Sequence, residues 1–165
     1  MAQTLAQLQS HFAHSGSVQW IGLRPQKRAD ILEVHSANVT PEDGLVGDRY
    51  QGRDRKRQVT LIQFEHIAVM AALTGVSDLH PAMLRRNIAV SGINLLALKD
   101  KRFAIGGAVL EFTGLCHPCS HMETVLGVGG YNAMRGHGGI NAMVIEGGLI
   151  AVGSSVAAIP ADPAA

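Results

Sequence analysis

Hydrophobic positions along the chain fall into short runs that alternate with polar and glycine-containing segments. The spacing of Leu5, Leu8 and Phe12 predicts a short amphipathic helix packed on the body of the protein. Beyond it, runs rich in valine and isoleucine predict strands bounded by turn residues. The predicted strands cover 18–23, 31–39, 58–63, 88–90, 95–98, 102–105, 108–113, 141–146, 149–152 and 155–159.

Three further helices are predicted between these strands. They cover 64–73, a short piece from Pro81 to about Arg86, and 119–126. The segment 44–57 contains glycines and charges without an apolar period, so it is predicted to be an exposed loop. A mainly β order with a few short peripheral helices favours a closed or nearly closed β-barrel.

The length of 165 residues, without an internal repeat, predicts a single domain. Its core is expected over about 18–159, with the N-terminal helix within 1–16 and a frayed tail over 160–165. Hydrophobic residues make up 47% and charged residues 16%, which excludes a disordered chain. No apolar run approaches the roughly 20 residues that a membrane-spanning helix needs, so no membrane partner is expected.

Glycine is enriched, with 19 residues, which indicates many tight turns or places of close backbone approach. The formal net charge of +1 identifies no partner. Five basic residues gather within 49–57, as expected of either a solvated loop or a site for an anionic group. Only Tyr50 lies near them to stack on a base, so no nucleic-acid partner is expected.

The start of the chain has neither the basic nor the apolar region of a secretory signal. Two cysteines, Cys116 and Cys119, are too few and too close in sequence for a disulfide framework. We therefore expect free thiols and a reducing, cytoplasmic location.

The segment 113–123 contains the densest group of reactive side chains. Cys119 follows Pro118 at the start of a predicted helix, where free backbone N–H groups favour a thiolate. His117 and His121 would add positive charge when protonated. Cys119 is thus a candidate nucleophile, sulfur carrier or metal ligand, with Cys116 as a second candidate thiol.

Other interpretations of these cysteines remain open. They would form a thioredoxin-like redox pair only beside a βαβ pattern, whereas the predicted neighbours are strands. A zinc site would use Cys116 and Cys119 with His121 or His137, without the second ligand pair of a zinc finger. A small buried cysteine in a turn is the structural alternative.

Three weaker polar groups accompany the cysteines. Asp48 and Arg49 offer a carboxylate and a guanidinium in a glycine-hinged loop. The run 85–87 ends a predicted helix, where it would clamp an anion or complement the helix dipole. Glycines flank Arg135 and His137, which makes the segment 129–139 a candidate lip of a pocket, although it lacks the context of a dinucleotide or phosphate loop.

Taken together, these segments resemble the MOSC domain, a family named for the C-terminal part of molybdenum cofactor sulfurases. The resemblance covers about 18–159 and depends on six motifs in the order of the family. These are GLVGDRY (44–50), QVTLI (58–62), RRNIAVSGINLL (85–96), RFAIG (102–106), TGLCHPC (113–119) and IEGGLIAVG (145–153).

The resemblance implies a stand-alone barrel of the pyruvate-kinase-barrel-like type. It also implies a molybdenum–pterin cofactor (molybdopterin), with a reactive cysteine that binds the molybdenum or takes up sulfur. The family cysteine usually follows proline, so it maps onto Cys119, whereas the family often has arginine in place of Cys116. Some relatives act on N-hydroxylated bases or amidoximes.

The resemblance and the residues together suggest roles for individual side chains. Cys119 would be the reactive thiolate and the metal ligand, with Cys116, His117 and His121 beside it. The residues expected to bind the cofactor are Asp48, Arg49, Arg86, Asn87, Thr113, Arg135 and His137.

Two enzymatic or carrier functions follow, and one non-enzymatic function competes with them. In the first, an N–O bond is reduced with electrons from a separate donor protein. In the second, the cysteine accepts sulfane sulfur, for example from a cysteine desulfurase, and passes it on. The alternative is a barrel that binds a small molecule and in which Cys119 only packs.

Overall fold

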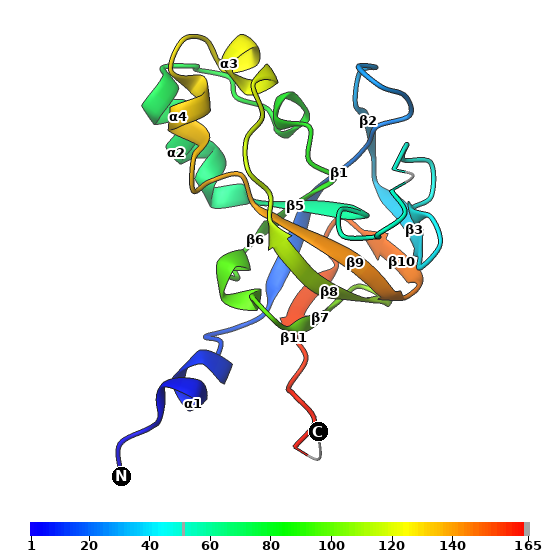
Figure 1. The fold of residues 1–165 in the computed structure, drawn as a ribbon, viewed down its shortest axis with the longest axis vertical. Coiled ribbons are helices and arrows are strands. Elements are labelled where there is room, and N and C mark those ends of the chain that lie inside the picture. The colour runs from blue at the N-terminus through cyan, green and yellow to red at the C-terminus, as the bar shows by residue number, and fades with distance from the viewer. Residues whose placement is uncertain (51, 164–165) are drawn as a thin grey trace.

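Seven strands close into a barrel in the computed structural model, which describes residues 1–50 and 52–163 (Figure 1). The strands are β1 (Gly16–Leu23), β5 (Val59–Gln63), β6 (Ile88–Ser91), β7 (Arg102–Ile105), β8 (Ala108–Leu115), β9 (Ile140–Glu146) and β11 (Ser155–Ala158). Their order around the barrel is β11, β7, β8, β9, β5, β6 and β1, and pairing of β1 with β11 closes the ring. The predicted closed, mainly β barrel is therefore confirmed.

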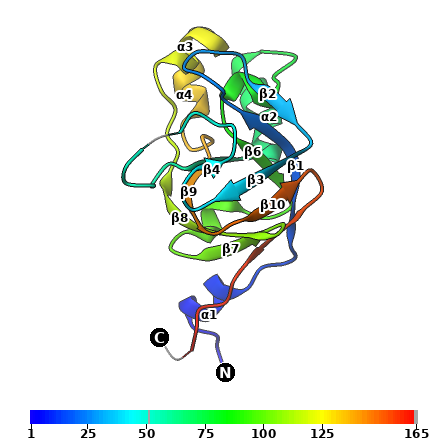
Figure 2. The ribbon, with the colours of Figure 1, turned by 90° about the vertical axis from the view of Figure 1, so that its right-hand side faces the viewer.

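Four shorter strands lie outside the ring. They are β2 (Leu32–Val34), β3 (Ser36–Thr40), β4 (Gly44–Leu45) and β10 (Gly148–Ala151). β2 pairs with β1, whereas β10, β3 and β4 form a small sheet of their own, seen in front of the barrel in Figure 2. The single strand predicted over 31–39 is thus two strands that separate at His35 and join different sheets.

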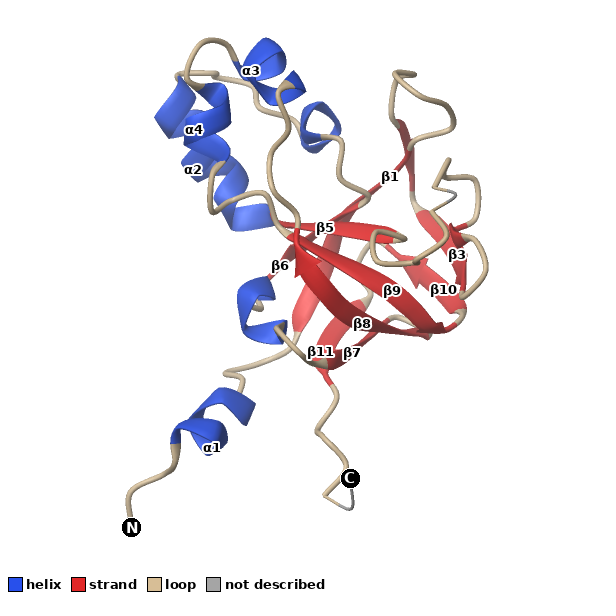
Figure 3. Cartoon of the chain, in the orientation of Figure 1, coloured by secondary structure: helices blue, strands red, loops and turns tan. Residues whose placement is uncertain are grey.

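The helices gather mainly at one end of the barrel. They are α1 (Leu5–Ser10), α2 (Phe64–Thr74), α3 (His121–Leu126) and α4 (Gly130–Met134), with two 3₁₀ turns, η1 (Pro81–Leu84) and η2 (Leu95–Leu98). Figure 3 shows α2, α3 and α4 together above the strands, with α1 extending from the opposite end. α2 ends at Gly75, because this residue adopts the left-handed conformation that stops a helix.

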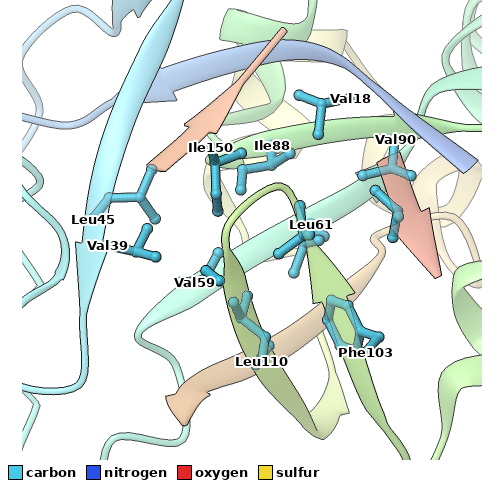
Figure 4. Close-up of a cluster of buried hydrophobic side chains, with 14 of the residues drawn as sticks. Val18, Val39, Leu45, Val59, Leu61, Ile88, Val90, Phe103, Leu110 and Ile150 are labelled. Carbon is cyan, nitrogen blue, oxygen red and sulfur yellow. The ribbon is translucent and has the colours of Figure 1, made fainter. Parts of the chain in front are cut away.

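β5 is buried on both faces, which explains its unbroken apolar pattern. Val59 and Leu61 point into the barrel core shown in Figure 4, where they join Phe103 and Leu110. Ile62 points outward into a second apolar cluster beneath the helices. Successive side chains of a strand point to opposite faces, so β5 joins the barrel core to the helical cover.

β5 and β6 form the one parallel pair among the strand pairs of the described residues. Parallel neighbours need a crossover connection, which α2 and η1 supply here. η1 ends at Arg85, a non-glycine residue with φ +56°. The crossover therefore delivers Arg86 and Asn87 to the outer face of the barrel immediately before β6.

Two more sequence predictions are corrected by the structure. The 95–98 segment forms the 3₁₀ turn η2 and not a strand, because the Asn94 side chain accepts a hydrogen bond from the Leu96 N–H and caps the turn. The third helix begins at His121 instead of Cys119. The segment 129–139 also contains a helix, α4, that was not predicted, and it still supplies residues to the wall of the cavity described below.

The N-terminal helix forms as predicted, but it does not pack on the barrel. Thr4 and Gln7 form a capping box that stabilises α1 locally. None of its residues is buried, and the side chains of Leu5 and Leu8 remain 70% and 52% exposed. The amphipathic spacing correctly predicted the helix, but of its three apolar residues only Phe12, which follows α1, packs against the barrel core.

Removal of residues 1–10 should leave the stability of the barrel nearly unchanged, because no side chain of α1 is buried. By contrast, Phe103→Ala should lower the free energy of unfolding by about 3–5 kcal/mol, since it empties a fully buried position. Urea denaturation of both variants measures the difference. A loss of similar size in the truncated protein would contradict the described position of α1.

Candidate functional site

A cavity of about 540 Å³ opens between η2, the end of β8 and the segment after α4. It is lined by Leu96, Leu115, Cys116, His117, Pro118, Tyr131, Arg135, Gly136, Gly138 and Gly139. The structure thus brings together Cys116, His117 and Arg135 from the predicted site residues. Cys119 is exposed and is not among the residues that line this cavity.

Arg86 binds the backbone of residues that line the cavity. Its side chain is buried, and its Nε donates to the Gly138 carbonyl at 2.8 Å. Its Nη1 donates to the Leu84 carbonyl at 3.1 Å, and its Nη2 lies 3.4 and 3.3 Å from the Cys116 and His117 carbonyl oxygens. Arg86 was predicted to receive an anion, but in this structure its donors hold the backbone on both sides of the cavity.

Two glycines allow the segment after α4 to approach the strands. A Cβ at Gly138 would lie 2.0 Å from the Cys116 carbonyl oxygen. Gly139 has φ +87°, and a Cβ there would lie 1.8 Å from the Leu61 carbonyl oxygen. Because the backbone comes this close, the Cys116 N–H can donate to the Gly139 carbonyl at 2.9 Å. These glycines therefore fix the wall that carries Cys116.

The Cys116 thiol is partly buried in a positively charged environment. Burial raises the pKa of this thiol, whereas the charges of Arg86, Arg57 and Arg24 oppose that rise. The net effect is a raised pKa, so the three guanidiniums offset only part of the cost that burial imposes on a thiolate at this position.

The geometry around Cys119 differs from the predicted helix start. Ser120 is the N-cap residue of α3, and the Cys119 carbonyl accepts a hydrogen bond from the Met122 N–H at 3.0 Å. Cys119 therefore precedes the helix and does not occupy its first turn. His121 is the first residue of α3 and is exposed.

Asp48 and Asn87 belong to a buried polar network next to the cavity wall. The Asp48 side chain is fully buried and accepts hydrogen bonds from Nε and Nη2 of Arg24 at 3.1 and 2.8 Å. The Asn87 Nδ2 donates to Asp48 at 3.1 Å, and its Oδ1 accepts from the N–H and hydroxyl of Thr60. Both residues were predicted to bind a cofactor, but their polar atoms are used to join four segments of the protein.

The remaining predicted binding residues are dispersed around the cavity. The Thr113 hydroxyl donates to the Lys56 carbonyl and so attaches the 44–57 segment to β8. Arg49 is exposed. The pKa of Arg85 is lowered by burial, by the charge of Arg24 and by the charge of Arg49. Arg135 is exposed on the cavity rim.

His137 forms a pair with His66, which was assigned no role from the sequence. Their Nδ1 atoms are 3.1 Å apart, and the rings meet edge to face at 4.7 Å between centroids. Burial and the charge of His137 lower the pKa of His66, and Glu65 opposes this effect. The pair attaches the segment that bears Gly138 and Gly139 to α2.

Sequence reasoning did not single out Arg24 and Arg57, whose charges act on Cys116, or Tyr131, which lines the cavity. Arg24 directly follows the strand predicted over 18–23, and Arg57 was one of five basic residues within 49–57 that their positions did not distinguish. The one available signal for Arg57 was its place immediately before the strand at 58–63. Tyr131 lies on α4, a helix that the glycine-rich pattern concealed.

The sequence model of the MOSC domain matches residues 10–157 of the chain. The chain belongs to the MOSC domain family. No curated protein sequence matches this MOSC domain. The six motifs that suggested the family all lie within the matched range.

Solved structures share the fold of this MOSC domain. The YuaD protein from Bacillus subtilis superposes with a TM-score of 0.74 at 20% identity, covering 87% of this chain and 94% of that one. YiiM from Geobacillus stearothermophilus gives a TM-score of 0.70 at 15% identity, covering 88% and 75%. YiiM from Escherichia coli gives 0.68 at 17% identity, covering 88% and 71%. At these identities the similarities establish the fold.

Within residues 1–50 and 52–163, no group of three or more His, Cys, Asp or Glu residues is arranged to hold a metal ion. The zinc site considered from the sequence therefore has no complete set of protein ligands there. In the same part of the MOSC domain, no helix has the length and apolar character needed to cross a membrane.

Asp48→Asn should destabilise the MOSC domain by about 3 kcal/mol, because it leaves the Arg24 guanidinium without its buried counter-charge. Urea denaturation measures this loss. Glu42→Gln is a suitable control, since Glu42 is exposed and its replacement should change stability by less than about 0.5 kcal/mol. Equal stabilities of the two variants would refute the assigned role of Asp48.

The His66–His137 pair should make stability depend on pH. The lowered pKa of His66 means that the unfolded chain binds more protons than the folded one in mildly acidic solution. The stability that His66 contributes is therefore fully present above pH 6.5, its ordinary pKa. It is lost as the pH falls through the lower pKa that His66 has in the folded state. The midpoint temperature of His66→Gln should fall less on acidification than that of the wild type.

Thermal scans between about pH 8 and pH 5 test this linkage. His35→Gln is the matched control, because His35 is exposed and outside the pair. A pH dependence of His66→Gln that matches the wild type would show that the pair is not titrating in this range.

Proposed function

We propose that this MOSC domain binds a molybdenum–pterin cofactor in the cavity beside Cys116 and presents cysteine sulfur to it. The observation that carries the proposal is the partly buried Cys116 thiol on the cavity wall. It lies close enough to Arg86, Arg57 and Arg24 for their positive charges to act on it. The family is generally linked to molybdenum cofactor binding and to sulfur-related function, which agrees with this chemistry.

The residues present fit such a cofactor in size and in chemistry. The cavity of about 540 Å³ falls within the range of small-molecule sites, roughly 300–1,000 Å³. Guanidinium groups bind phosphate through charge-assisted hydrogen bonds, and a thiolate is a suitable ligand for a metal that prefers sulfur. The Arg57 backbone forms a hydrogen bond with the Tyr50 hydroxyl, but no described residue forms a hydrogen bond or ion pair with the Arg57 guanidinium, so its donors remain for a ligand.

In this proposal the residues around the cavity have different roles. Arg57 and Arg135 bind the anionic part of the cofactor, and Arg49 adds positive charge nearby. Arg86 is a positioning residue, because its donors hold the carbonyls of Cys116, His117 and Gly138. Cys116 faces the cavity, and Cys119 remains a second thiol beside it.

When bound, a molybdenum–pterin cofactor supplies oxidation–reduction chemistry such as the reduction of N–O bonds. Electrons for such a reaction would come from a separate donor protein. In the sulfur-transfer alternative, a cysteine accepts sulfane sulfur and delivers it within the cavity. The sulfur-transfer function is favoured here because two thiols, one exposed and one on the cavity wall, lie three residues apart.

Co-expression with the molybdenum cofactor pathway, followed by metal analysis and pterin extraction, tests the proposal. The wild-type protein should retain both molybdenum and pterin in stoichiometric amounts. Arg57→Gln should weaken cofactor binding by roughly tenfold or more, since a charge-assisted hydrogen bond contributes about 1.5–3 kcal/mol.

Arg53→Gln is the matched control, because Arg53 lies in the same segment and is exposed as Arg57 is, but it is not among the guanidiniums whose charge acts on Cys116. This variant should bind the cofactor as the wild type does. Purified wild-type protein that carries neither pterin nor molybdenum would overturn the proposal, and so would equal losses in the two arginine variants.

A further inference from the structure

The two cysteines occupy different environments on one short turn. Cys116 is partly buried and lines the cavity, whereas Cys119 is exposed and lies outside its wall. Pro118 between them is buried and anchors the turn. A reagent that is too large for the cavity therefore meets Cys119 first.

The backbone at Cys116 is held from both sides. Its N–H donates to the Gly139 carbonyl at 2.9 Å, and its carbonyl lies 3.4 Å from the Arg86 Nη2. Cys119 has a looser attachment, in which its carbonyl accepts from the Met122 N–H. Cys116 is thus a fixed sulfur position, and Cys119 is the end of the turn that faces solvent.

Burial and charge act in opposite directions on an anionic sulfur at Cys116, because burial raises the pKa of its thiol and three nearby guanidiniums oppose that rise. Three guanidiniums act on Cys116, and the charge of Cys119 is also close enough to affect it. A persulfide is more acidic than a thiol, so it is an anion in neutral solution and gains from this positive environment. Sulfur that moves from Cys119 to Cys116 would leave the solvent-exposed end of the turn and reach the cavity wall.

We propose that Cys119 receives sulfane sulfur from an external persulfide and passes it inward to Cys116. This inference rests on the proposed sulfur-related function and gives it a direction. It reverses the order suggested by the sequence, in which Cys119 was the thiolate that faces the ligand.

Both steps conserve atoms and electrons. In the first, the Cys119 thiolate attacks the outer sulfur of a donor R–S–SH, so that Cys119–S–SH forms and the donor leaves as a thiolate. In the second, the Cys116 thiolate attacks the outer sulfur of Cys119–S–SH. The Cys119 sulfur–sulfur bond breaks, Cys116–S–SH forms and Cys119 leaves as a thiolate, so one sulfur atom moves without net oxidation.

Time-resolved mass spectrometry with glutathione persulfide as the donor tests this relay. Fragmentation that separates Cys116 from Cys119 locates the added sulfur atom. In the wild type the added mass should appear first on Cys119 and then accumulate on Cys116. In Cys116→Ser it should remain on Cys119, and in Cys119→Ser the loading of Cys116 should be at least about tenfold slower.

Ser120→Ala is the matched control, because Ser120 adjoins Cys119 and its side chain does not cap α3. Circular dichroism confirms that all variants are folded. If Cys116 loads at the wild-type rate in Cys119→Ser, the relay is wrong while the sulfur-related function stands. If neither cysteine of the wild type takes up sulfur, the sulfur-related function itself fails.

Discussion

The buried guanidinium of Arg86 is the interaction on which the geometry of the site depends. It reaches four backbone carbonyls, from η1, from the turn after β8 and from the segment after α4. These three segments are far apart in sequence and have few regular hydrogen bonds of their own. A single side chain with a rigid fork of donors therefore sets the distance between the cysteine turn and the glycine-rich wall. A lysine could not replace it, because its donors radiate from one atom.

A second polar centre, formed by Asp48, Arg24 and Asn87, complements the first. Buried charges are costly unless they are paired and fully hydrogen-bonded, and Asp48 meets that condition with two bonds from the Arg24 guanidinium. The Asp48 carboxylate offsets part of the Arg24 charge, so Arg86 and Arg57 are the cations that act most strongly on Cys116. The outer face of the barrel thus carries the paired charges of Asp48 and Arg24 and the cations near Cys116, whereas the interior of the barrel is apolar.

The sequence predicted the barrel well because strands with apolar faces leave a direct pattern. β5 and β9 were both found close to their observed bounds, and their side chains fill the core. Local hydrogen bonds were harder to foresee. The cap that Asn94 provides turns 95–98 into a 3₁₀ segment although its composition suits a strand. Likewise, the sequence identified the cysteine pair, but the choice of the sulfur that faces the cavity depends on contacts with Arg86 and Gly139, distant in sequence.

The closing seam between β1 and β11 places the two ends of the folded barrel beside each other. Gly16 pairs with Val156, so the chain enters and leaves the ring at one location. Both terminal segments extend from the end of the barrel opposite to α2, α3 and α4 (Figure 1). Affinity tags, surface tethers or fused proteins attached at either terminus would therefore point away from the cysteine turn. The fold is suited to modular attachment, in which the barrel is anchored at its base and its opposite end stays accessible.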